Sequence, residues 1–127
     1  MEDLLSVNWL AVITGTLVAF LVGWLWYSPK LFGTKWAQGV GVDLGEAKAM
    51  PVFAMVAQLL ALLLLALVIG ITATFNALIT AIVAILAAAM FVVSSGAFVQ
   101  KSRYALTVEF FYILVSGVIM ILAQAIF

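Results

Sequence analysis

The sequence has 127 residues, of which 69% are hydrophobic and 8% charged, and its five basic and five acidic residues give a formal net charge of zero. A soluble domain is closer to half apolar and a quarter charged, and a small domain has too little interior to hide this excess. The bilayer must therefore be the solvent for most of the surface. The neutral balance argues against a nucleic-acid partner, and without Cys or His the chain lacks thiols and the commonest general base and metal ligand.

The first apolar run covers about residues 5–28, enough for one helical crossing, which needs roughly 20 residues. Small residues recur at every fourth position of this run, so they share one face of the helix. These residues are Ala11, Gly15, Ala19 and Gly23. A stripe of small side chains lets another helix approach closely, and we predict a packing seam here.

Aromatic side chains crowd the end of this run and the segment after it. They are Trp24, Trp26, Tyr27, Phe32 and Trp36. Rings with one polar edge favour the level of the lipid headgroups, so the pattern predicts an interface belt. A second interpretation is a recognition surface for a partner subunit, a lipid or a flat pigment. Pro29 ends the helix, and the mixture of lysines with large apolar residues over 30–36 is typical of a segment lying in the interface.

Two further apolar runs, at about 52–71 and 77–97, predict the second and third crossings. The link between them, 72–76, is short and uncharged, so the two helices must be antiparallel neighbours. The third helix carries a second predicted seam of small residues, formed by Ala77, Ala81, Ala84 and Ala88. Before the second crossing, Asp43 and Glu46 have the spacing of a capping box, which predicts a short helical turn.

The fourth apolar run, about 105–126, carries Glu109, the only acid within a predicted crossing. Tyr112 and Ser116 fall on nearly the same helical face, and Gln58 of the second helix lies at a similar depth. An acid inside a membrane is a functional-site candidate by default. These four residues therefore form the candidate polar site.

Two interpretations of this polar site stay open. In the structural one, Glu109 pairs with Lys101 or Arg103 or meets headgroup water, and Gln58 bonds to Glu109 or Tyr112 between helices. In the functional one, Glu109 couples protons to transport.

Four crossings place both termini on the same side of the membrane. The two loops on the other side, 29–51 and 98–104, contain every basic residue of the chain. These are Lys30, Lys35, Lys48, Lys101 and Arg103. The positive-inside rule then predicts that both loops are cytoplasmic and that both termini lie outside.

Part of the sequence also resembles a known family. The matching residues are VNWLAV at 7–12 and GWLWYSPKLFG at 23–33, followed by Trp36. They are similar to the bacterial membrane proteins grouped as domain-of-unknown-function family 1761. The resemblance implies a compact four-helix protein of a bacterial cytoplasmic membrane. It implies no activity and carries over no functional residues.

We therefore expect an all-α integral membrane protein with a single domain over 1–127. Its four transmembrane helices form an antiparallel bundle, with a short interfacial segment between the first and second. Its expected partners are the lipid bilayer and copies of itself or other membrane subunits, and we expect no cofactor, metal site or catalytic residues.

Three functional classes follow from these expectations. The first is a non-enzymatic structural or accessory protein, acting as an oligomer or as a subunit of a larger complex. The alternative is a homo-oligomeric transporter or channel for protons or small solutes that uses Glu109. A membrane enzyme fits least, because the sequence offers no nucleophile with a base.

Overall fold

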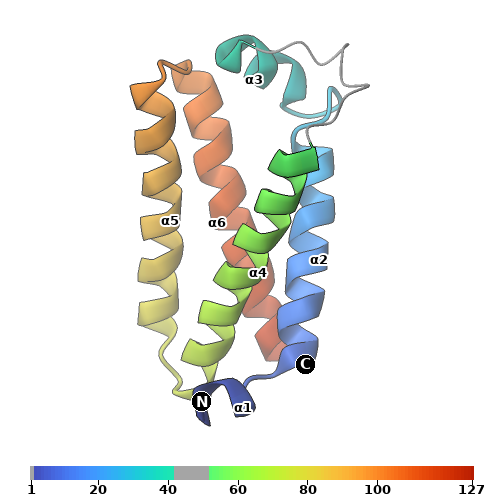
Figure 1. Cartoon of the computed structure of the whole chain (residues 1–127), viewed down its shortest axis with the longest axis vertical. Coiled ribbons are helices and arrows are strands. Elements are labelled where there is room, and N and C mark those ends of the chain that lie inside the picture. The colour runs from blue at the N-terminus through green and yellow to red at the C-terminus, as the bar shows by residue number, and fades with distance from the viewer. Residues whose placement is uncertain (1, 42–51) are drawn as a thin grey trace.

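The computed structural model describes residues 2–41 and 52–127, and within these ranges every regular element is a helix (Figure 1). The helices are α1 (Glu2–Leu5), α2 (Trp9–Trp26), α3 (Gly33–Val40), α4 (Val52–Thr74), α5 (Leu78–Phe98) and α6 (Arg103–Ile126). Four of them, α2, α4, α5 and α6, are long and apolar enough to cross a membrane. They run alternately up and down, which confirms the predicted antiparallel all-α bundle. Lys48 and the turn predicted after Asp43 lie outside the described residues.

The first spanning helix begins later and ends earlier than the apolar run that predicts it. Asn8 caps α2, because its side-chain oxygen accepts a hydrogen bond from the Ala11 amide at 3.2 Å. At the other end the chain folds into a tight turn, in which the Gly33 amide donates to the Ser28 carbonyl at 2.8 Å. A Cβ on Gly33 would collide with the Tyr27 carbonyl oxygen, so only glycine fits there.

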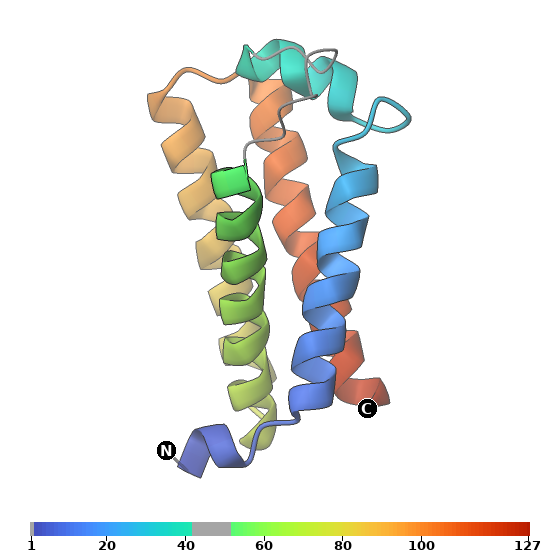
Figure 2. The same cartoon turned by 45° about the vertical axis from the view of Figure 1, so that its right-hand side comes forward.

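The short helix α3 lies across one end of the bundle, where α6 begins (Figure 2). The Ser102 amide donates to the Gly39 carbonyl at 2.9 Å, and the Lys35 ammonium lies 4.6 Å from the centroid of the Tyr104 ring. Both contacts join α3 to the start of α6. A side chain on Gly39 would collide with the Ser102 hydroxyl, so this glycine is what allows the close approach.

The packing of α2 on α6 follows the first predicted seam. All four small residues of that seam, Ala11, Gly15, Ala19 and Gly23, are buried. Gly15 lies against Met120 and Ala123, and Gly23 lies against Tyr112. The larger side chains of α6 thus fill the space that the small residues of α2 leave.

The packing of α5 on α6 differs from the second predicted seam. The buried residues of α5 are Ala81, Ile85, Ala89 and Gly96, whereas Ala77, Ala84 and Ala88 are only half-buried. The reason lies on the partner helix: Gly117 of α6 leaves room for the Ile85 side chain. The contact face of α5 therefore includes Ala81 of the predicted seam, but it continues through Ile85 and Ala89 in place of Ala84 and Ala88.

Substitution of Gly117 by Ala should destabilise the bundle, because a Cβ there would lie 2.8 Å or less from three carbon atoms of Ile85. Overpacking of this kind costs about 1–3 kcal/mol. Reversible unfolding in detergent by an SDS titration, followed by circular dichroism, measures the loss. The second substitution Ile85→Ala should restore part of it, and Val118→Leu at an exposed position is the neutral control. A Gly117→Ala protein as stable as the wild type would contradict this packing.

Candidate functional site

The predicted polar face of α6 points into the protein. Glu109, Tyr112 and Ser116 are all buried, and Met120 and Ala123 continue the same buried face. Their spacing of three or four residues places them in one row along the helix. α6 packs against α2, α4 and α5, so this row lies at the centre of the bundle.

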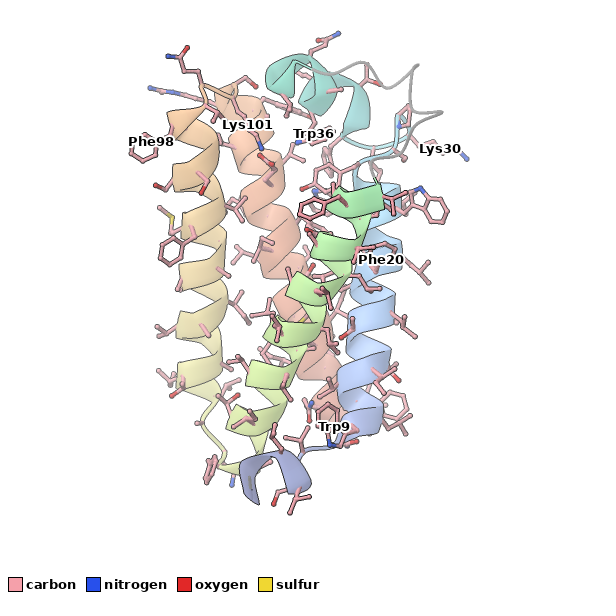
Figure 3. The ribbon with its side chains drawn as sticks, in the orientation of Figure 1. Trp9, Phe20, Lys30, Trp36, Phe98 and Lys101 are labelled. Atoms are coloured by element: carbon pink, nitrogen blue, oxygen red, sulfur yellow. The ribbon has the colours of Figure 1, made fainter. Side chains whose placement is uncertain are left out.

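Glu109 forms an ion pair with Lys101, whose ammonium lies 2.7 Å from the carboxylate oxygen Oε1. The Glu109 side chain is 11% exposed and the Lys101 side chain 23%, so the pair is largely shielded from solvent. Figure 3 shows the Lys101 nitrogen beside the first turns of α6. Of the two predicted partners the structure selects Lys101, whereas Arg103 is exposed.

The turn between α5 and α6 explains this choice of partner. Gln100 adopts a left-handed conformation with φ of 61°, and the Lys101 amide donates to the Gly96 carbonyl at 3.0 Å. This is the pattern of a Schellman motif, which reverses the chain at the end of a helix. The reversal directs Lys101 back toward Glu109.

Three buried polar side-chain atoms have no hydrogen-bond partner within the described part of the chain: Glu109 Oε2, Trp36 Nε1 and Ser116 Oγ. A buried polar atom without a partner is costly, and in native proteins it is usually satisfied by water or a ligand. Oε2 of Glu109 is therefore a hydrogen-bond acceptor without a partner, whereas Oε1 of the same carboxylate binds Lys101.

Tyr112 joins α6 to α2 at the same depth. Its hydroxyl donates a hydrogen bond of 2.7 Å to the Ala19 carbonyl, and a Cβ on Gly23 would lie 2.5 Å from that hydroxyl oxygen. The side chains of Gln58 and Ser116 also approach the hydroxyl, but the Ser116 hydroxyl has no hydrogen-bond partner among the described residues. The four predicted polar residues thus gather around α6, with Glu109 and Tyr112 as the two that make strong contacts.

The aromatic residues predicted to form a belt divide into two groups. Trp24 points outward and is 62% exposed. The other four, which are Trp26, Tyr27, Phe32 and Trp36, turn inward and form an aromatic cluster with Tyr112.

Direct ring contacts hold this aromatic cluster together. The Tyr27 ring centroid lies 4.8 Å from that of Trp36 and 5.4 Å from that of Tyr112. The Trp26 indole donates to the Val108 carbonyl of α6 at 3.0 Å. Burial raises the pKa of the Tyr27 phenol, and the nearby Glu109 charge raises it further. These four residues thus pack on one another and on α6, and their place at the level of the headgroups stays a prediction.

The fold and this buried polar row define the class of protein: a small, multi-pass α-helical membrane protein. The family model described as "Protein of unknown function (DUF1761)" matches residues 10–124, and the chain belongs to this family. The resemblance seen in the sequence is thereby confirmed. Neither a curated protein nor a solved structure matches the chain.

The two partners of the ion pair should respond unequally to substitution. Lys101→Met leaves the Glu109 carboxylate buried without a cation and should lower the free energy of unfolding by about 3 kcal/mol. Glu109→Gln leaves Lys101, whose flexible side chain can extend toward water, and should cost about 1 kcal/mol. Unfolding in detergent measures both losses.

The double variant Lys101→Met with Glu109→Gln should recover much of the larger loss, because no charge is then left unpaired. Arg103→Met, at an exposed position, is the matched control and should change stability by less than about 0.5 kcal/mol. A loss in the double variant equal to the sum of the two single losses would show that Glu109 does not depend on Lys101.

Proposed function

We propose that the protein is a non-enzymatic component of the bacterial cytoplasmic membrane. It acts as a structural or accessory protein, either as an oligomer or as a subunit of a larger membrane complex. The observation that carries this proposal is the ion pair, because the acid inside the fourth span is held by Lys101 of the same chain. Tyr112 and Trp26 likewise bind carbonyl groups of neighbouring helices. These polar groups serve helix packing, whereas a transport site would keep them free for a solute.

The outer surfaces of α4 and α5 support a role in assembly. In each of these two helices only 17% of the spanning stretch is buried, compared with 33% in α2 and 39% in α6. Large apolar side chains cover these surfaces, including Leu60 on α4 and Phe91 on α5. Lipid or the helices of another membrane subunit can cover such a surface.

One observation favours the transporter as a second candidate. The Oε2 atom of Glu109 is buried and has no partner within the described residues, so the acid has acceptor capacity to spare. In that case several copies of the chain would form the pathway, and Glu109 would carry the proton or bind the solute.

Native mass spectrometry of the protein, extracted gently from its own membrane, separates the two candidates. Stoichiometric co-purification with other membrane subunits is the result that the accessory role predicts. A discrete homo-oligomer without another polypeptide, together with proton-coupled flux in liposomes that Glu109→Gln abolishes, would overturn that role in favour of transport. Flux that survives Glu109→Gln would exclude the Glu109-centred mechanism.

We also propose that loops 29–51 and 98–104 face the cytoplasm and that both termini lie outside. In support, the basic residues Lys30 and Lys101 lie at the same end of the bundle (Figure 3). Arg103 begins α6 at that end, and Lys35 reaches the Tyr104 ring there. An accumulation of positive charge at one end is typical of the cytoplasmic side.

The absence of cysteine makes this orientation easy to test with single substitutions. Thr34→Cys lies on α3 and Phe75→Cys in the α4–α5 turn, and both positions are exposed. In intact cells a membrane-impermeant maleimide should label the Phe75→Cys protein and leave the Thr34→Cys protein unlabelled. Both proteins should react after the cells are opened. The reverse pattern in intact cells would contradict the orientation.

A further inference from the structure

The surface of α5 carries a groove next to the buried ion pair. The groove has a volume of about 450 Å³ and is lined by Phe91, Val92, Ser95, Gly96, Val99 and Lys101. Its walls are mostly apolar, and its polar groups are the Ser95 hydroxyl and the Lys101 ammonium. The groove lies at the end of a spanning helix, where hydrocarbon gives way to headgroups.

A second feature lies directly behind this groove. Gly96 has no side chain, and the ends of two neighbouring side chains fill the space beside it. A Cβ built on Gly96 would lie 2.5 Å from Leu106 Cδ2, 3.1 Å from Lys101 Cδ and 3.8 Å from Glu109 Oε2. This oxygen is the buried acceptor without a partner, and Glu109 as a whole is only 8% exposed. Beside it, the Lys101 ammonium uses one of its three N–H groups for Oε1. The polar end of the groove therefore offers a cationic donor in its lining. A free anionic acceptor lies behind it, under the ends of the Leu106 and Lys101 side chains.

The charge of this site selects the headgroup of a lipid ligand. A purely anionic headgroup is disfavoured on two counts. Glu109 already neutralises the charge of Lys101, and the Glu109 carboxylate would repel a second anion. A choline headgroup has no N–H to donate to Oε2. An ethanolamine headgroup complements both groups, because its phosphate accepts from lysine and its ammonium donates to a carboxylate.

We propose that this groove binds a phospholipid with a primary ammonium headgroup. The phosphate contacts Lys101, the ammonium reaches Glu109 Oε2 past Gly96, and an acyl chain lies along Phe91 and Val92. The Lys101 side chain is long and 23% exposed, and Leu106 meets this space only with the end of its side chain. Both side chains shift to admit the ammonium. The site does not depend on the proposed accessory role, since a lipid could bind with or without partner subunits.

Native mass spectrometry of the whole protein, released from nanodiscs with equal amounts of three lipids, tests this proposal. The lipids have ethanolamine, choline and glycerol headgroups on the same acyl chains. The wild type should retain the ethanolamine lipid over the choline lipid by roughly tenfold, the ratio expected for one charge-assisted hydrogen bond. In Glu109→Gln this preference should disappear, and the anionic glycerol lipid should gain, because Lys101 is then unpaired.

Two further variants test the groove itself. Val99→Trp should fill it and lower retention of all three lipids, whereas Val118→Trp, at an exposed position of α6 outside the groove, should leave retention unchanged. Circular dichroism and thermal unfolding check that each variant is folded. Should Glu109→Gln fail to fold, the pair of tryptophan variants still decides the question. Equal retention of the three lipids by the wild type, an unchanged preference in Glu109→Gln, or no effect of Val99→Trp would each overturn the proposal.

Discussion

Polar groups inside a bilayer must find partners within the protein, and this requirement organises the structure. α6 meets that requirement at three points: the Glu109 carboxylate pairs with Lys101, the Tyr112 hydroxyl binds the Ala19 carbonyl, and the Val108 carbonyl accepts from Trp26. These contacts connect α6 to the α5–α6 turn and to α2. The spans arrange around α6 because its buried row is the face that lipid cannot solvate.

Glycines on the elements that face α6 make these contacts possible. Gly23 gives the Tyr112 hydroxyl access to the α2 backbone, and Gly96 leaves the space in which Lys101 and Leu106 pack. Gly39 brings α3 against Ser102. In a membrane the hydrophobic effect does not drive helices together, so close backbone approach and hydrogen bonding must do so. The polar row and the glycines are thus two parts of one packing arrangement.

The sequence alone predicts those features that one helix determines by itself. The four-residue spacing from Ala11 to Gly23 marks the buried face of α2, and the spacing from Glu109 to Ser116 marks that of α6. Features that depend on two elements could not be predicted in this way. The contact face of α5 depends on Gly117 of α6, the inward turn of Trp36 depends on Tyr27, and the choice of Lys101 over Arg103 depends on the left-handed Gln100.

The acid inside the fourth span is paired with a lysine of its own chain. Solid-state NMR of the protein in lipid bilayers can measure this directly, through the dipolar coupling between the side-chain nitrogen of Lys101 and the carboxyl carbon of Glu109. The structure predicts a strong coupling, in keeping with the 2.7 Å ion pair, that disappears in Lys101→Gln. A coupling that is absent in the wild type, or that persists in this variant, would contradict the pairing of Glu109 with Lys101.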